Sequence, residues 1–426
     1  MAEIKGISLR MNQQLIKKLA DQLKSSAEGA LPPGKESEFL GFQMHDGVAY
    51  SLTNEAARTF NEVVSKLLGQ KQFSKKFSSK YVEKKLKAVF AELLSNPKCD
   101  LEKKISDLGD ELSSFDQNNI VFLKIEGIVL SACLTIGKVR FVPGDEYLIQ
   151  NINDKSSAII KTSKNDEESK KSFKDLIEQQ SRSEFQGGCV GVVEVNAEPV
   201  RAFEYAKEEV RRAIDLLRFS TKAIYPLSED IRIGLKGDHP KTQRQGFIAS
   251  EIGFNTQGDS VGSVLPFEIN EDAIRRMDEI GVFLVSDALS KKQTNNLEEA
   301  LIRAIHWFSV ALTQSELSNS FLFLVVALES LFKAERGNSI GGTVAESVAF
   351  IMADNLEGRK QLISIVRDYY GKRSGVAHGG NKSITDSELF TLINIVGTTL
   401  MVVIEKLKEF SSQKELMGWI EEMKLK

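Results

Sequence analysis

Hydrophobic positions repeat with the period of a helix in the first and last thirds of the chain. Apolar residues return every three or four positions over residues 11–27 and 54–68, which predicts two amphipathic helices there. The last third has the same period over residues 297–312, in the unbroken apolar run 321–328, and over residues 389–407. Helices of this kind bury their apolar stripes against one another, so an antiparallel bundle is expected at the C-terminal end.

The middle of the chain changes to the pattern of strands. Short apolar runs are separated there by glycines such as Gly127 and Gly137, and a helix with one apolar face is predicted over residues 198–219. The polar, charge-rich stretch 152–187 is expected to be a long loop or mobile insertion. Strands are predicted within residues 120–141, 190–195, 230–236, 243–249 and 260–268.

Together these patterns predict an α+β fold, with a mixed α/β region in the N-terminal part followed by an all-α helical bundle. The expected parts are a mostly helical region over residues 1–115, a mixed region over 116–285, and the bundle over 290–426. Capping boxes of the form Thr-x-x-Glu predict that helices of the bundle begin at Thr343 and at Thr385.

Composition limits the classes of function. The chain has 426 residues, a net charge of −3 and a pI near 6.0, so contact with a nucleic acid must come from a local patch. Its three cysteines, Cys99, Cys133 and Cys189, are widely spaced and lack the spacing of metal ligands, which favours buried thiols in a reducing cytoplasm. The longest apolar run, of eight residues, is far short of the roughly 20 needed to cross a bilayer. We therefore expect a cytoplasmic protein with no membrane partner, no metal and no cofactor.

A basic segment near the N-terminus is a candidate RNA contact. Eight lysines lie between Lys66 and Lys87, interleaved with aromatic residues, and this combination suits single-stranded backbones and bases. The ordinary alternative is an aromatic stripe that faces the core beside a solvated lysine face. On a helix the lysines of one stripe would be Lys76, Lys80, Lys84 and Lys87, next to Phe73, Phe77 and Tyr81.

The most informative motif for chemistry lies near the C-terminus, where Arg373 is followed by His378. An arginine can hold a phosphate and stabilise its developing charge, and a histidine can transfer protons near neutral pH. The apolar stripe of the preceding helix leads to Arg373, so this cation must meet a carboxylate, a phosphate or a partner subunit. Glu329 directly follows the apolar run 321–328 and is the expected partner. We predict that the two side chains lie within ion-pair distance.

Two sequence segments carry a family resemblance. The segment Ala-Leu-Glu-Ser-Leu-Phe at 327–332, followed by Tyr370, Arg373, Ser374, His378 and Gly379, resembles the HEPN superfamily of helical nucleases, in particular its Apea-like branch, over residues 290–415. The resemblance implies a metal-independent endoribonuclease that acts as a dimer, often in anti-phage or abortive-infection responses. It assigns Arg373 and His378 as the catalytic pair, with Glu329, Ser374 and Tyr370 in support. Serine after the arginine departs from the Asn, Asp or His of many relatives.

The chemistry of RNA cleavage favours a composite site. Attack by the 2′-hydroxyl needs a base, an acid for the leaving oxygen and a cation for the phosphorane, and a two-fold dimer would supply two histidines and two arginines. Residues five apart are about 140° apart on a straight helix, so convergence of Arg373 and His378 would need a helix break near the glycines or a cleft between protomers. The partners predicted are an RNA substrate, a second copy bound through the bundle, and a phage-derived trigger or regulatory protein acting on residues 1–285.

Three alternatives stay open. Arg373 and His378 could simply end a helix, with Arg373 on a carbonyl or on Glu329 and His378 as a polar cap. The bundle could be a non-catalytic dimerisation or RNA-binding module, or the pair could act on another phosphate-containing substrate. The other histidines, His45, His239 and His306, lack a second ligand at metal spacing and are expected to be ordinary surface or core residues.

Overall fold

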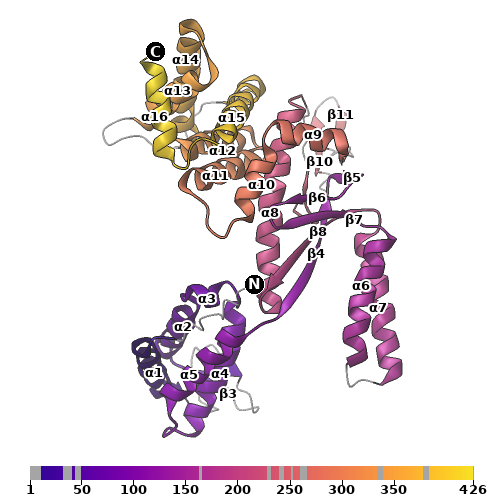
Figure 1. Cartoon of the computed structure of the whole chain (residues 1–426), viewed down its shortest axis with the longest axis vertical. Helices are drawn as coiled ribbons and strands as arrows, with labels where there is room; N and C mark the ends of the chain where they lie inside the picture. The colour runs from indigo at the N-terminus through magenta and orange to yellow at the C-terminus, as the bar shows by residue number, and fades with distance from the viewer. Residues whose placement is uncertain are drawn as a thin grey trace, which may run out of the picture. The chain divides into compact units, whose positions relative to one another are not determined.

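The computed structural model describes residues 11–31, 41–43, 49–162, 166–227, 232–238, 244–250, 253–259, 266–332, 339–377 and 383–425. The fold is α+β, as predicted (Figure 1). In sequence order, helices come first and last, and the strands of the main sheet come between them. By internal contacts the chain forms two compact units. The first comprises Met1–Val121 with Glu194–Ala206, and the second comprises Phe122–Val193 with Lys207–Lys426.

The first unit is a cluster of helices around an aromatic core. The predicted helices 11–27 and 54–68 are confirmed as α1 (Gln13–Glu28) and α2 (Asn54–Leu68), and each begins at a side-chain cap. The rings of Phe60 and Phe90 meet edge to face at 5.4 Å in the centre of the core. The remaining elements are α3 (Lys71–Ser74), α4 (Ser79–Ser95), α5 (Leu101–Ser114), β1 (Ala30–Leu31), β2 (Gly41–Gln43) and β3 (Ala49–Leu52).

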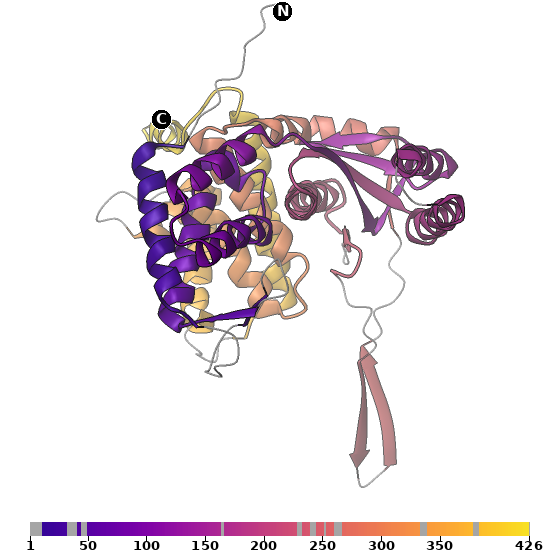
Figure 2. The same cartoon turned by 90° about the horizontal axis from the view of Figure 1, so that it is seen from below.

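The main sheet is curled and has five strands in the order β6-β7-β8-β4-β9; most of it belongs to the second unit, while residues 118–121 of β4 and 194–196 of β8 belong to the first. The helix α8 (Pro199–Ile224) lies along this sheet; it confirms the predicted helix 198–219 and continues five residues beyond it (Figures 1 and 2). Gly191 of β8 permits this close packing, since a Cβ there would lie 3.3 Å from Cγ2 of Val210. The strands are β4 (Asn118–Glu126), β6 (Leu134–Ile136), β7 (Val139–Pro143), β8 (Cys189–Asn196) and β9 (Gly234–Leu235).

Two smaller pairings complete the β structure. β5 (Ile128–Leu130) pairs in parallel with β12 (Phe267–Ile269), and β10 (Arg244–Ser250) forms an antiparallel hairpin with β11 (Gly253–Asp259). The strand β11 was missed because residues 253–259 contain two glycines and few apolar side chains, which does not give the alternation of a half-buried strand.

The stretch expected to be a long loop is instead a helical hairpin, so that prediction was wrong. It consists of α6 (Glu146–Thr162) and α7 (Glu167–Phe185), which lie side by side in Figure 2. The Asp166 carboxylate caps α7 by accepting from the Ser169 amide at 2.8 Å. Ion pairs at helical spacing, such as Arg182 with Glu178, use the charged residues that had suggested a loop.

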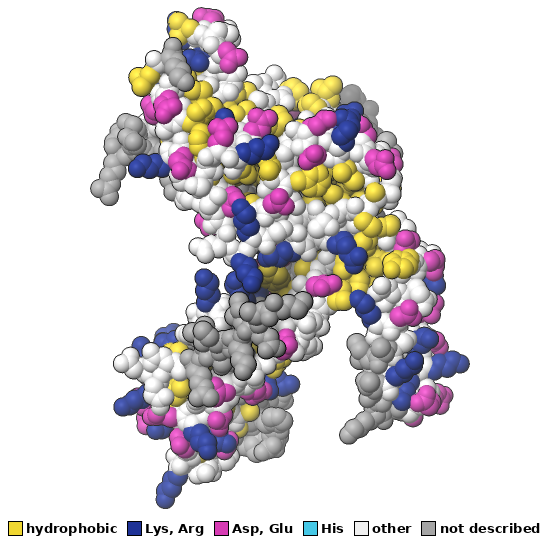
Figure 3. All heavy atoms as spheres, viewed as in Figure 1, with side chains coloured by type: hydrophobic (Ala, Val, Ile, Leu, Met, Phe, Trp, Pro, Cys, Tyr) yellow, Lys and Arg dark blue, Asp and Glu magenta, His cyan; other side chains and the backbone are white. Residues whose placement is uncertain are grey.

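The C-terminal bundle consists of helices that pack on a shared apolar core. α15 (Asp386–Lys406) is, among the described residues, the one helix long and apolar enough to cross a membrane, and its buried face packs against α11, α12 and α13. Hydrophobic side chains also gather in patches on the visible face of this part (Figure 3). The other helices are α9 (Glu271–Glu279), α10 (Val282–Ser290), α11 (Asn296–Ala311), α12 (Leu317–Leu331), α13 (Ile340–Met352), α14 (Leu356–Ala377) and α16 (Gln413–Lys424).

One of the two predicted helix starts in the bundle is confirmed. Thr385 and Glu388 form a full capping box at the start of α15. The predicted start at Thr343 was wrong, because Ser339 caps α13 by accepting from the Gly342 amide at 3.3 Å. The helix therefore begins four residues earlier than the Thr-x-x-Glu pattern indicated.

Candidate active site

The helices α12 and α14 bring Glu329 and Arg373 together, as predicted. Nη2 of Arg373 donates to Oε2 of Glu329 at 3.3 Å. The two side chains remain 38% and 21% exposed, so the pair lies at the edge of the bundle, within reach of a ligand. Among the described residues Glu329 is the one polar partner of Arg373, and the rest of the guanidinium keeps its donors for another acceptor.

Apolar packing fixes where these two side chains lie. Phe321 and Leu328 on α12 are fully buried, and Tyr369 on α14 packs edge to face on Phe321 with ring centroids 5.4 Å apart. This contact holds α14 against α12 one turn before Arg373. The register of the ion pair therefore follows from the core packing of the two helices.

Tyr370 lies beside the ion pair in an apolar setting. Burial raises the pKa of its phenol well above the ordinary value, and the neighbouring Glu329 charge adds to the rise, while Arg373 opposes it. Its hydroxyl is buried and has no hydrogen-bond partner among the described residues. Gly341 of α13 leaves the space for the ring, since a Cβ there would lie 2.8 Å from Cδ1 of Tyr370.

The last turns of α14 are tied to the start of α15. Nζ of Lys372 pairs with Glu388, the acidic residue of the α15 capping box. This pair raises the pKa of Lys372 and lowers that of Glu388. Ser374, the next residue after Arg373, is exposed and lies on the outer side of the helix.

His378 lies outside the described residues, so its convergence with Arg373 stays a prediction. The helix α14 continues through Gly371 and Gly375 to Ala377. A helix break was one of two routes by which Arg373 and His378 could converge, and it does not occur at either of these two glycines; Gly379 and Gly380 lie outside the described residues. Glycine alone weakens a helix by only about 1 kcal/mol, which the packing of α14 offsets.

The predicted lysine stripe divides into different environments. Lys76 precedes α4 and donates to the Phe115 carbonyl at 2.7 Å, so it does not share a helix with the others. Lys87 pairs with Glu83 at 2.6 Å, whereas Lys80 and Lys84 are exposed. The neighbouring aromatics belong to the interior: Phe73 and Phe77 are buried, and Tyr81 stacks on Phe77 at 5.2 Å.

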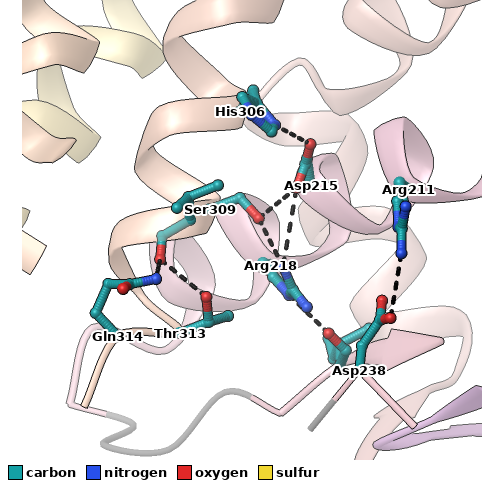
Figure 4. A network of polar contacts seen from close by, with 10 residues as sticks. Arg211, Asp215, Arg218, Asp238, His306, Ser309, Thr313 and Gln314 are labelled. Atoms are coloured by element: carbon teal, nitrogen blue, oxygen red, sulfur yellow. Dashed lines mark hydrogen bonds and ion pairs between the residues drawn. The ribbon is translucent and has the colours of Figure 1, made fainter. Parts of the chain in front are cut away.

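A second polar cluster joins α8 to α11 and was not anticipated from the sequence. The buried Asp215 carboxylate lies 2.8 Å from Nδ1 of His306 and accepts a hydrogen bond from Ser309 at 2.6 Å (Figure 4). Nε of Arg218, also buried, donates to the Ile233 carbonyl at 2.6 Å. His306 was expected to be an ordinary histidine. Asp215 and His306 are 91 positions apart in the sequence and lie on different helices, so no local sequence pattern predicted their pairing.

The described part of the chain contains no candidate metal-ion site. Across these residues no group of three or more His, Cys, Asp or Glu side chains is arranged to hold a metal ion. The expectation of three buried thiols holds for Cys189 but was wrong for Cys133, which is exposed, and Cys99 is partly buried. Burial raises the pKa of the Cys189 thiol to about 12, which keeps it protonated and unreactive. Comparisons with protein-family models, with curated proteins and with solved structures find no match for the chain.

Proposed function

We propose that this chain is a metal-independent endoribonuclease of the HEPN type, with its active site at the end of α14. The observation that carries the proposal is the Arg373–Glu329 pair. A half-exposed guanidinium is held at 3.3 Å by a carboxylate from a neighbouring helix, five residues before His378. A site for phosphoryl chemistry needs a cation of fixed position that keeps free donors, and Arg373 meets both conditions.

In the proposed reaction the protein residues share three tasks. His378 takes the proton from the ribose 2′-hydroxyl, and an imidazole from a second copy protonates the leaving 5′-oxygen. Arg373 donates to the non-bridging oxygens of the phosphorane, while Glu329 restricts the rotamers of its side chain. The products are an RNA with a 2′,3′-cyclic phosphate and one with a 5′-hydroxyl. The dimer forms through the bundle, so that two-fold symmetry places both pairs at one scissile phosphate.

The wider role follows from the same resemblance. In this proposal the protein is a cytoplasmic effector of anti-phage or abortive-infection defence, and the region before the bundle receives the activating signal. The support for this part is the order of motifs in the last third of the chain and the placement of a separate unit before it.

The test is cleavage of RNA in the presence of a chelator. The purified full chain is expected to cut single-stranded RNA in excess EDTA and to leave 2′,3′-cyclic ends. Arg373→Ala and His378→Ala should each lose activity by at least 10²-fold. The matched control is Arg367→Ala, because Arg367 lies on the same helix, is more exposed at 58%, and also pairs with a glutamate, Glu346. Activity that persists in both site variants would refute the proposal.

A specific observation favours the non-catalytic alternative. The one described partner of Arg373 is a carboxylate of its own chain, which is also what a purely structural ion pair would show. A binding or dimerisation module would retain RNA in a shift assay or self-associate, and would leave the RNA intact. The same protein preparation therefore separates the two functions.

A further inference from the structure

An aromatic pair on the outer part of the bundle has the geometry of a stacking platform. The rings of Trp307 on α11 and Phe323 on α12 are nearly parallel, with an interplanar angle of 14° and centroids 5.3 Å apart. Both residues are only partly buried. Core aromatics such as Phe308 and Phe321, in contrast, are fully enclosed. The platform thus keeps part of an extended aromatic surface in solvent, at a cost that a ligand would offset.

Two basic side chains flank this platform. His306 is half exposed and its ring lies 5.2 Å from that of Trp307. Arg303 lies one turn earlier on α11, on the same side as Trp307, and is exposed. Within the described ranges its guanidinium has neither an ion pair nor a hydrogen bond. The nearest acid along the helix, Glu299, accepts instead from the Thr294 hydroxyl at 3.2 Å.

The buried side of the His306 imidazole is held in one orientation by Asp215 of α8. Nδ1 of His306 is engaged by the buried Asp215, which is itself fixed by Ser309, so Nε2 is the nitrogen left for a ligand (Figure 4). The hydrogen bond from Asp215 raises the pKa of His306 above its ordinary value, although burial and the Arg218 charge oppose the rise. The two charged groups that face the imidazole from α8 are therefore Asp215 and Arg218.

We propose that Arg303, His306, Trp307 and Phe323 form a binding surface for single-stranded RNA. A base stacks on the Trp307–Phe323 platform, and the adjoining phosphates lie against Arg303 and the Nε2 side of His306. This inference rests on the proposed nuclease function, since it specifies how the same bundle holds its substrate. The surface is better suited than the lysine segment of the first unit, where the aromatic rings are turned inward and two of the four lysines are already engaged.

The chain offers a direct optical test, because it contains two tryptophans. In a Trp419→Phe background Trp307 is the sole indole, and Arg373→Ala is added to prevent cleavage. Titration with a twelve-nucleotide oligouridylate in EDTA should quench the Trp307 emission and saturate. Arg303→Ala, a change at an exposed position, should weaken binding about tenfold, and Trp307→Leu by tenfold or more in an anisotropy assay with labelled RNA.

Trp419→Leu is the matched control for the anisotropy assay. Trp419 is also partly buried beside a cation, with Nζ of Lys406 4.7 Å from its ring, but that lysine is paired with Glu409 at 2.8 Å. Binding should be unchanged in this variant. The Arg303→Ala result does not depend on a core substitution, so it remains informative if Trp307→Leu fails to fold.

The outcomes separate this inference from the proposed function. Saturable quenching without any cleavage by the parent chain supports the surface and refutes the nuclease. Cleavage with a silent Trp307 and an unchanged KM in Arg303→Ala overturns the surface and leaves the nuclease intact. An emission change that depends on protein concentration, and not on RNA, would mean that a second copy covers the platform, which also overturns the inference.

Discussion

The strength of the Glu329–Arg373 pair can be measured with a double-mutant cycle. Glu329→Gln and Arg373→Met each remove one charge and keep most of the side-chain volume. At 3.3 Å the Coulomb energy of two unit charges is about 1.3 kcal/mol at the dielectric constant of water, and about 5 kcal/mol at an effective value of 20. Because both side chains keep contact with solvent, the lower figure applies, reduced by desolvation and lost side-chain entropy. We expect a coupling free energy of about 1 kcal/mol.

Urea unfolding followed by tryptophan emission suits this measurement. Both tryptophans, Trp307 and Trp419, lie on helices of the bundle, so the signal reports the part that contains the pair. The coupling should fall by at least half in 1 M NaCl, where the Debye length is about 3 Å. A coupling below about 0.3 kcal/mol, or one that salt leaves unchanged, would refute the view that the two side chains form a solvent-accessible ion pair.

Three further outcomes are expected. Gly341→Ala gains up to about 1 kcal/mol of helix propensity, but it forces a Cβ against the Tyr370 ring, which costs about 1–3 kcal/mol. Thermal unfolding should therefore show a net loss of stability, and the RNase assay should show a loss of activity. Arg218→Met removes a buried guanidinium that donates to the Ile233 carbonyl and lies 3.9 Å from Asp215, so it should cost about 1–3 kcal/mol in urea unfolding. Arg275→Met, at an arginine 60% exposed whose partner Asp272 is also exposed, should cost less than about 1 kcal/mol. The pKa of His306 is raised in the folded protein, so its ion pair with Asp215 stabilises the fold fully at pH values below the ordinary pKa of 6.5. This stabilisation is lost as the pH rises through the raised pKa. His306→Gln should therefore lower the free energy of unfolding more at pH 5.5 than at pH 9.

Local patterns in the sequence were sufficient to predict the Glu329–Arg373 contact. The apolar run before Glu329 had to be buried, and the stripe that leads to Arg373 had to face the same core, so two opposite charges were brought to one edge. The helices α1, α2 and α8 and the strand β10 followed from the same kind of periodicity. In these cases the pattern that determines each element is set by residues within one or two turns of each other.

Other features depend on contacts that no local pattern contains. The α6–α7 hairpin is rich in charge, and the same composition suits a loop or an exposed pair of helices until the cap and the packing partner are known. Asp215 lies on α8 and His306 on α11, and the sequence around each residue is equally compatible with an exposed side chain. Their pairing needs the docking of α8 on α11, which the sequence pattern does not specify.

The discontinuity of the first unit has a consequence for anyone who dissects this chain. Residues 194–206 belong to the first unit, although in the sequence they come after β5, β6, β7 and the α6–α7 hairpin, which belong to the second. A fragment that stops at residue 121 therefore lacks part of its own structure, and a fragment that starts at residue 207 keeps β9 alone of the five strands of the main sheet. The effect of a truncation on activity would therefore combine loss of folded structure with any loss of regulation. Insertion of a protease site at residues 163–165, between α6 and α7, would instead sever the backbone and leave the components of both units in place.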